Sequence, residues 1–318
     1  VGEEGIDYGG LTSNFFADIF CHAATAGYLE RGSLLCFLPV RDSQILPGMR
    51  SESVFEVLGS LLCKSICDLR LVPPSTFPPL VWKLLLSPEE SWRQLATLAE
   101  CERFDEEVSR GYVNTLLMDA SDMMLDFSDL GLPPQMVTND NKEQYVHLAV
   151  PHFLIESRRQ NLCHLRNGFW KFASMCNIEH VLLALDWRDL CQLACGVEIV
   201  TAQELLSMMA FDGTPRNIEE FFCTVFREWE AESPHFLLAF IEYVTGIPGI
   251  PGDRVLVNPR YGTPSVIQVS VYNSKVFKLP QAQTCVFALT VSRYENAHML
   301  RQHLEYAILE GRDGFHLQ

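Results

Sequence analysis

The sequence has no long apolar run and no excess of positive charge. No window approaches the roughly 18 consecutive apolar residues that a membrane-spanning helix needs. The most apolar stretch, HFLLAFIEYV (235–244), is interrupted by Glu242. Lys and Arg number 24 against 40 Asp and Glu, which gives a formal net charge of −16. Such a chain is repelled by a phosphate backbone and by an anionic membrane surface, so neither nucleic acid nor a membrane is predicted as a partner.

Several common active-site motifs are also missing. The sequence contains no H-E-x-x-H and no G-x-S-x-G, which leaves a zinc protease and an ordinary serine hydrolase without support. The glycines of GIPGIPG (246–252) recur every third residue, but the prolines between them remove N–H groups that a phosphate cradle needs. We expect a tight turn there, and the sequence predicts no cofactor.

Eleven cysteines are spread along the chain, an odd number that does not indicate a compact disulfide framework. A reducing compartment, the cytoplasm or the nucleus, is therefore predicted. Cys63/Cys67 and Cys191/Cys195 are i, i+4 pairs on expected helices, a spacing that could direct two thiolates at one metal. No second pair or nearby His cluster completes four ligands, so core packing is the favoured interpretation and no metal is predicted.

The chain is long enough for one large domain or two unequal ones. It has 318 residues, of which 48% are hydrophobic and 20% charged, and a single core stops growing near about 250–300 residues. Helical patterns dominate residues 1–195, and strand patterns appear later, for example in SVIQVSVY (265–272). We therefore expect an α+β protein with a boundary near 196–200. Because the chain starts at Val1, we also expect it to be the C-terminal part of a longer protein.

The same patterns predict individual elements. A loop at the start of 129–150 is expected to enter a helix capped by Asn139 or Asp140, with Tyr145 and Leu148 facing inward. Further helices are predicted at 51–69, 78–87, 87–102, 155–174, 187–196, 201–211, 217–230, 233–246 and 294–311, and strands at 253–259, 265–272 and 285–291.

Cys285 is the cysteine whose sequence surroundings suggest chemistry. It follows Thr284 at the end of LPQAQTC (279–285), a proline-bearing loop that runs into the expected strand. A thiol at such an edge is partly exposed and can meet a reaction partner, whereas a thiol on the apolar face of a helix cannot. From these residues alone, a core thiol is the favoured interpretation and a nucleophile is the alternative.

Nine short blocks occur in order along the whole chain. They are GEEGIDYGGLTSNFFADIF (2–20), FEVLGSLLCKSI (55–66), VWKLLL (81–86), VTNDNKEQYVHL (137–148), NGFWKF (167–172), LACG (193–196), VTGIPGIPG (244–252), LPQAQTC (279–285) and GFHLQ (314–318). Each block alone is weak evidence, but their joint order and spacing are specific. Together they resemble the catalytic domain of HECT-type E3 ubiquitin ligases, in a compact and divergent form.

This resemblance implies a bilobal α+β fold. A mainly helical N-lobe (1–196) would contain an E2-binding subdomain at about residues 88–150. A flexible hinge at Gly196 would join it to a smaller α/β C-lobe (197–318) that carries the catalytic cysteine.

The resemblance also implies a reaction. Ubiquitin would arrive as a thioester on a ubiquitin-conjugating enzyme (E2), pass to Cys285 as a second thioester, and then pass to a lysine of a protein substrate. Thr284 would orient the thiol, and Phe315 would assist the transfer to lysine. The implied E2 contacts are Tyr145, Trp92 and Leu95.

The residues around Cys285 depart from the family pattern. Gln283 stands where the family usually has His, and Val286 and Phe287 stand where it usually has Phe and Asn. In other enzymes one lost oxyanion donor costs about 2.7–4 kcal/mol of transition-state stabilisation. An alternative function is therefore a catalytically weak or inactive HECT module that binds E2 or ubiquitin.

A second alternative is a cysteine hydrolase that acts on ubiquitin conjugates. It would need an imidazole beside the Cys285 sulfur. The nearest histidines in the sequence are His298 and His303, both on the expected terminal helix.

Overall fold

Two compact units make up the chain. The structure, a computed structural model, describes residues 10–34, 36–45, 51–73, 76–120, 123–197, 200–258, 263–272 and 278–316. Unit 1 comprises Val1–Asp18, Leu69–Pro74 and Gln192–Gln318, and unit 2 comprises Ile19–Asp68 and Ser75–Cys191. The predicted lobe boundary at residue 196 lies just beyond the division between Cys191 and Gln192, and the assignment of N-lobe and C-lobe stays a prediction.

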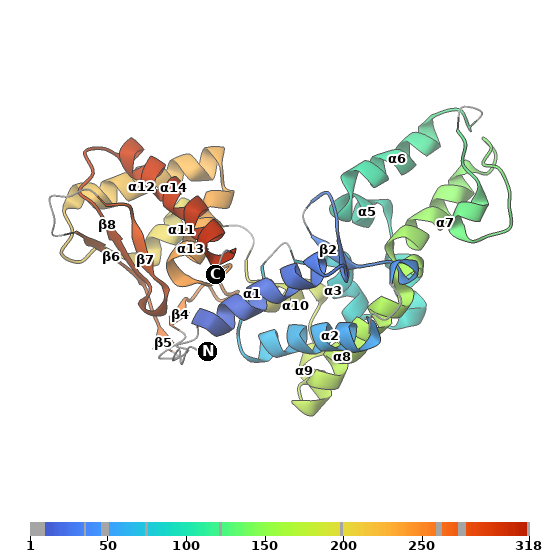
Figure 1. The fold of residues 1–318 in the computed structure, drawn as a ribbon, viewed down its shortest axis with the longest axis horizontal. Coiled ribbons are helices and arrows are strands. Elements are labelled where there is room, and N and C mark those ends of the chain that lie inside the picture. The colour runs from blue at the N-terminus through green and yellow to red at the C-terminus, as the bar shows by residue number, and fades with distance from the viewer. Residues whose placement is uncertain are drawn as a thin grey trace. The chain divides into compact units, whose positions relative to one another are not determined.

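Unit 2 is mainly helical, with one antiparallel pair of short strands near its start (Figure 1). Its elements are β1 (Leu29–Arg31), β2 (Phe37–Pro39), η1 (Asp42–Gln44), α2 (Ser51–Cys67), α3 (Pro79–Leu86), η2 (Glu89–Ser91), α4 (Trp92–Leu95), α5 (Leu98–Phe104), α6 (Glu106–Leu117), η4 (Phe127–Leu130), α7 (Lys142–Leu154), η5 (Glu156–Arg158), α8 (Arg159–Met175) and α9 (Glu179–Leu182). The division between the units falls inside α1 (Gly10–Thr25) and α10 (Trp187–Cys195).

Helices α2 and α8 lie side by side with their backbones in contact (Figure 1). Glycine makes this approach possible at two facing positions. A Cβ added at Gly59 would lie 1.9 Å from Leu165 O, and one added at Gly168 would lie 1.9 Å from Glu56 O. Ser60 Oγ lies 2.9 Å from Glu56 O and 3.0 Å from Gly168 O, so its hydroxyl bridges the two helices. The relative position of α2 and α8 is therefore fixed by main-chain contacts.

Unit 1 contains a four-stranded mixed sheet with the order β3-β6-β8-β7. Strands β3, β6 and β8 are parallel neighbours, and β7 pairs antiparallel with β8 at the edge of the sheet. The elements of the unit are α11 (Ala202–Ser207), β3 (Met209–Ala210), α12 (Arg216–Glu232), α13 (His235–Thr245), β4 (Val257–Asn258), β5 (Thr263–Pro264), β6 (Ile267–Val271), β7 (Gln281–Gln283), η6 (Thr284–Val286), β8 (Ala288–Val291) and α14 (Ala297–His316).

The core of unit 1 forms between this sheet and its helices. Ile267 and Val269 of β6 are buried and alternate with exposed Gln268 and Ser270, which confirms the predicted period of a half-buried strand. Leu289 and other apolar residues of β8 join the same core. The helices contribute aromatic side chains that contact one another edge to face or stacked, among them Phe222, Phe226, Trp229 and Phe240.

The predicted α+β class is confirmed, and several element bounds are corrected. The expected helix at 87–102 is three short elements, η2, α4 and α5, because Ala96 leaves the helical conformation and the Thr97 side chain accepts a hydrogen bond from Glu100 N to start α5. Helix α7 begins after Asn141 rather than after Asn139 or Asp140. The helix expected at 201–211 begins with a capping box of Thr201 and Glu204 and ends early, at Ser207.

The strand predictions are corrected in a similar way. Of the described residues of the segment 253–259, which are 253–258, Val257 and Asn258 are in a strand. The strand predicted at 285–291 begins at Ala288, because η6 occupies Thr284–Val286. The helix predicted at 294–311 is α14, which starts at Ala297. Within the described residues, no helix is long and apolar enough to cross a bilayer.

Candidate functional site

Cys285 lies in the tight connection between two antiparallel strands of unit 1. Strand β7 ends at Gln283, β8 begins at Ala288, and these two residues are paired in the sheet. The four residues between them form η6 and its cap, so Cys285 is at the tip of a hairpin on the sheet edge. Its side chain is partly exposed. This position allows a large reaction partner to reach the sulfur without opening the core.

Phe287 anchors this hairpin in an unusual backbone conformation. Its φ of 51° and ψ of 48° place it in the left-handed region, where Asn is enriched and most other non-glycine residues are uncommon. Its ring is fully buried in the core of unit 1. In the family pattern described above, this position is usually Asn. The left-handed conformation explains that preference, because Asn adopts it more readily than most residues. Here the burial of an aromatic ring offsets the cost of the conformation.

The GIPGIPG segment begins next to the residue that precedes the cysteine. Gly246 ends α13 with a φ of 68°, and its N–H donates to Glu242 O. A Cβ added to Gly246 would lie 3.5 Å from the Cβ of Thr284. Thr284, predicted to orient the thiol, therefore packs against the C-terminal end of α13.

The chain that leads into β7 is held from two sides. The Tyr243 hydroxyl of α13 donates to Pro280 O at 2.7 Å. Burial raises the pKa of Tyr243, and a hydrogen bond with the Ala282 backbone opposes that rise. Ser292 Oγ accepts from Lys278 N at 2.8 Å and donates to Lys278 O at 2.7 Å. These contacts fix the segment 278–282 immediately before Cys285.

A pocket of about 590 Å³ opens beside the hairpin, on the side of β6. Val286 contributes to its wall directly after the cysteine. Its other walls come from Gln268 and from the segment around Val255, Leu256 and Pro264. Arg254, which pairs with Glu204 of α11, lies at the same pocket. Val286 is thus the residue of the β7–β8 connection that lines this pocket.

Gly196, the predicted hinge residue, has close contacts within unit 1. Its φ is 76°, and an added Cβ would lie 2.2 Å from Ile250 O and 2.9 Å from a Leu71 methyl carbon. The next residue, Val197, donates its N–H to Ile250 O at 2.8 Å. Glycine is required here by both conformation and space, and a hinge role stays a prediction.

The remaining predicted residues of this unit lie on α14. Phe315 belongs to its last turn, and its side chain is outside the described part of the chain. His298 is exposed, and His303 Nδ1 lies 2.6 Å from Met299 O in the same helix. A cysteine hydrolase stays an alternative.

The three predicted E2 contacts lie in unit 2, and they differ in exposure. Trp92 is fully buried, and its Nε1–H points at Leu84 O and Ser87 O, each 3.2 Å away. Tyr145 is almost fully buried, with its ring edge-to-face against Phe127 at 5.4 Å between centroids. Leu95 is half-buried. Trp92 and Tyr145 thus pack beneath the surface of this region, and direct contacts of the three residues with E2 stay a prediction.

Three exposed apolar residues, together called the apolar patch below, lie at and shortly after the end of α6. Leu117 is 77% exposed and Met118 51% exposed at the end of α6, and Met124 is exposed in the following segment. Sequence patterns missed these residues because they lie at and beyond a helix end, where no periodicity marks them. A pocket of about 590 Å³ lies between α4, α5, α6 and α7, and its wall mixes apolar residues such as Leu116 and Val150 with polar ones such as Arg93 and Glu143.

The Asn-rich segment before α7 holds the end of α6, which carries Leu117 and Met118. Asn139 Oδ1 accepts from Ala120 N at 2.9 Å, and its Nδ2 donates to Asp119 Oδ1 at 3.0 Å. Lys142 Nζ donates to Met118 O at 2.7 Å. The segment therefore ties the start of α7 to the end of α6.

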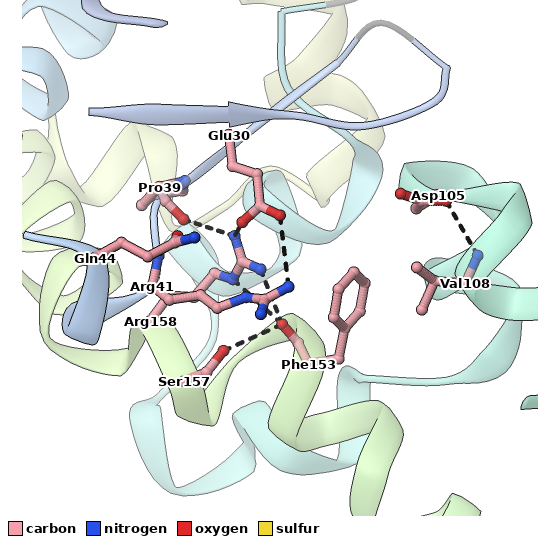
Figure 2. A network of polar contacts seen from close by, with 9 residues as sticks. All are labelled: Glu30, Pro39, Arg41, Gln44, Asp105, Val108, Phe153, Ser157 and Arg158. Carbon is pink, nitrogen blue, oxygen red and sulfur yellow. Dashed lines mark hydrogen bonds and ion pairs between the residues drawn. The ribbon is translucent and has the colours of Figure 1, made fainter. Parts of the chain in front are cut away.

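A buried arginine joins the same region to the strand pair of unit 2. Figure 2 shows Arg158 with its guanidinium directed at main-chain and carboxylate oxygens. It donates to Phe153 O at the end of α7, to Pro39 O at 2.7 Å, and to Glu30 Oε2 at 3.1 Å. Burial lowers the pKa of Arg158, and the Glu30 charge opposes that change. Because the guanidinium also lies over the Phe104 ring, it connects α5, α7, β1 and β2.

Comparison with known proteins identifies one family. The family described as "HECT-domain (ubiquitin-transferase)" matches residues 20–318. A bifunctional serine/threonine-protein kinase/NEDD4-like E3 ubiquitin-protein ligase of Dictyostelium discoideum is 26% identical over 269 residues, 83% of this chain and 13% of that protein. The E3 ubiquitin-protein ligase TOM1-like of Neurospora crassa is 24% identical over 346 residues, 99% of this chain and 8% of that protein.

A third relative shows the same relation. The E3 ubiquitin-protein ligase etc-1 of Caenorhabditis elegans is 26% identical over 345 residues, 100% of this chain and 32% of that protein. The chain thus spans between 8% and 32% of the length of these relatives.

Proposed function

The chain belongs to the HECT family of ubiquitin transferases, and on this premise we propose that it is the catalytic part of an E3 ubiquitin ligase that uses Cys285 as its nucleophile. The observation that carries the proposal is the partly exposed thiol at the tip of the β7–β8 hairpin. Family membership brings ubiquitin, an E2 and a protein substrate as partners. The eleven cysteines favour a reducing compartment, the cytoplasm or the nucleus.

The proposed reaction has two transfers. In the first, the Cys285 thiolate attacks the carbonyl carbon of the E2–ubiquitin thioester, and the E2 sulfur leaves as a thiolate. In the second, the amine of a substrate lysine attacks the new thioester, loses a proton, and releases the Cys285 thiolate as an isopeptide bond forms. The first exchange replaces one thioester by another, so the protein contributes mainly by positioning the reactants.

The structure supports this positioning role. Tyr243 and Ser292 hold the segment before β7, and Thr284 packs against Gly246. We assign the pocket beside Val286 to the C-terminal segment of ubiquitin, because it opens next to the thioester position. Phe315 is assigned to the transfer to lysine on the strength of the family match alone.

The E2-binding surface is proposed to be the apolar patch of Leu117, Met118 and Met124. It is exposed, and the Asn-rich segment holds it in place. Tyr145 and Trp92 would pack beneath this surface and hold it in place, and Leu95 would contact E2 at its margin. An apolar patch framed by polar residues is the usual character of a protein-binding site.

A thioester assay tests the proposal. The chain is incubated with E1, an E2 and ubiquitin, and the products are separated on a non-reducing gel with and without thiol. We expect a thiol-sensitive ubiquitin adduct on the wild-type chain and none on Cys285→Ala. Cys223→Ala is the control, because Cys223 is also partly exposed in unit 1, and it should keep the adduct.

Two results would contradict the proposal. An adduct that persists in Cys285→Ala would place the nucleophile elsewhere. A wild-type chain that forms no adduct with any E2 of a panel, while still binding E2 or ubiquitin, would favour a binding module without transferase activity.

A further inference from the structure

One histidine and two glutamates converge where α2 and α8 cross, in unit 2. Glu52 and Glu56 are one turn apart on α2, and His164 is on α8. One ligand atom of each side chain lies within 4.8 Å of the other two. These residues are far apart in the sequence and have no part in the proposed ubiquitin transfer.

The backbone beneath this cluster is held rigidly. Gly168, one turn after His164, is in contact with the main chain of Glu56, and Gly59 is in contact with that of Leu165. The Ser60 hydroxyl bridges Glu56 O and Gly168 O. Because these main-chain contacts fix α2 against α8, the Cα atoms that carry the three side chains are held at constant distances from one another. A metal site benefits from such a platform, since its ligands need little reorganisation.

The charges of the cluster are incompletely balanced. Two carboxylates at i and i+4 on one helix repel each other. Lys171 Nζ lies 3.6 Å from Glu56 Oε2, and no such cation lies at Glu52 within the described part of the chain. His164 Nδ1 is buried and has no hydrogen-bond partner among the described residues. The cluster therefore offers a net negative charge and an imidazole with unused hydrogen-bonding capacity.

We propose that Glu52, Glu56 and His164 bind a divalent transition-metal ion that bridges α2 and α8. An imidazole with two carboxylates suits Zn²⁺ and related first-row ions, whereas Mg²⁺ and Ca²⁺ prefer oxygen alone. Bonds of about 2.0–2.2 Å place neighbouring ligand atoms roughly 3.3 Å apart in a tetrahedron, so binding would draw the three ligand atoms closer than the 4.8 Å limit within which they lie. Three protein ligands leave a position for water.

Calorimetric titration with Zn²⁺ tests the site. The chain, stripped of metal with a chelator, is titrated as wild type, Glu52→Gln and His164→Gln. We expect one saturable site in the wild type and affinity at least roughly tenfold weaker in each variant, since even loss of an indirect ligand contact has such an effect. Because Glu52 is exposed, Glu52→Gln should fold normally. It therefore tests the site even if His164→Gln destabilises α8.

A matched variant and a second metal separate this site from other sources of binding. Glu106→Gln removes another exposed glutamate of the first turn of a helix, one that pairs with Arg110 across one turn of α6, and it should leave the Zn²⁺ affinity unchanged. A Co²⁺ complex should lack the near-ultraviolet thiolate bands that binding to exposed cysteines would produce. Equal affinity in wild type and Glu52→Gln, strong thiolate bands, or no saturable binding would each overturn the proposal.

Discussion

Gly196 shows how backbone conformation and space together restrict a single residue. An alanine there must adopt a φ of 76° and place its Cβ 2.2 Å from Ile250 O. Gly213, in the same unit, has a φ of 74° but no atom within 4 Å of an added Cβ. The two positions share the conformational cost and differ in the clash.

We predict that Gly213→Ala lowers the free energy of unfolding by about 1–2 kcal/mol, the cost of the left-handed conformation alone. Gly196→Ala should lower it by clearly more, because the main chain around Ile250 must also move. Urea denaturation followed by tryptophan fluorescence measures both losses. Equal losses in the two variants would show that the contact with Ile250 is not restrictive.

Arg158 is the second residue whose surroundings give a quantitative expectation. Its side chain is fully buried and donates to two main-chain oxygens and to Glu30. Arg158→Met removes these donors, although Phe153 O still accepts from Ser157 Oγ at 3.4 Å and Glu30 still pairs with Arg41 at 3.6 Å. Breaking a buried ion pair costs roughly 3–5 kcal/mol. The lower end applies, because Glu30 is 28% exposed and regains water.

Arg110→Met is the matched control for that substitution. Arg110 pairs with Glu106 across one turn of α6, and both side chains are exposed. Exposed pairs of this kind contribute about 0.3–0.5 kcal/mol. Chemical denaturation should therefore separate the two variants clearly, and a small loss for Arg158→Met would mean that water replaces its hydrogen bonds.

Among the elements, the edge strand β7 has the most direct relation to chemistry. It is three residues long, it pairs on one side only, and Cys285 follows it after one residue. A strand this short depends on contacts outside the sheet for its position. The Tyr243 hydroxyl supplies one of them through Pro280 O.

We predict that Tyr243→Phe slows ubiquitin loading of Cys285 by up to about tenfold, equivalent to 1.4 kcal/mol in the transition state. The removed hydrogen bond contributes about 0.5–1.5 kcal/mol to stability, so thermal unfolding should change only modestly. Tyr306→Phe, on the exposed face of α14, should change neither. If Tyr243→Phe lowers stability and leaves the loading rate at the wild-type value, the hydroxyl has no positioning role.

Periodicity predicted the long elements and failed at the short ones. Helix α2 and strand β6 follow their apolar patterns closely. The helix expected at 87–102 is broken because Thr97 caps a new helix, a local hydrogen bond that competes with continuation. Strand β7 (Gln281–Gln283) has a single apolar side chain, Ala282, between two exposed glutamines, which is too short an alternation to predict a strand.

The candidate site was predictable only in part, for a related reason. Local chemistry left Cys285 open between nucleophile and core thiol, and the ordered family blocks favoured the first. Tyr243 and Pro280 are 37 residues apart, and Ser292 and Lys278 are 14 apart. Contacts over such separations depend on the fold of unit 1, so no local pattern indicates them. The same holds for Glu52 and His164 on α2 and α8.

For the whole molecule, the two units suggest a division of work. Cys285 and the residues that hold its hairpin belong to unit 1, and the apolar patch of Leu117, Met118 and Met124 belongs to unit 2. If E2 binds the patch, the first transfer depends on both units. In the proposed reaction the second transfer, from Cys285 to a lysine, does not involve E2, so it should not depend on the patch.

The double variant Leu117→Ser/Met118→Ser should therefore separate the two steps. We predict that it raises the E2 concentration needed for half-maximal loading by roughly tenfold or more, because apolar interface residues of this kind commonly contribute over 1 kcal/mol. Once loaded with excess E2 and chased with free lysine, it should lose ubiquitin at the wild-type rate. Met175→Ser, which changes another exposed methionine of unit 2, should affect neither step. A slower discharge with unchanged loading would place the patch in the second transfer and contradict its assignment to E2.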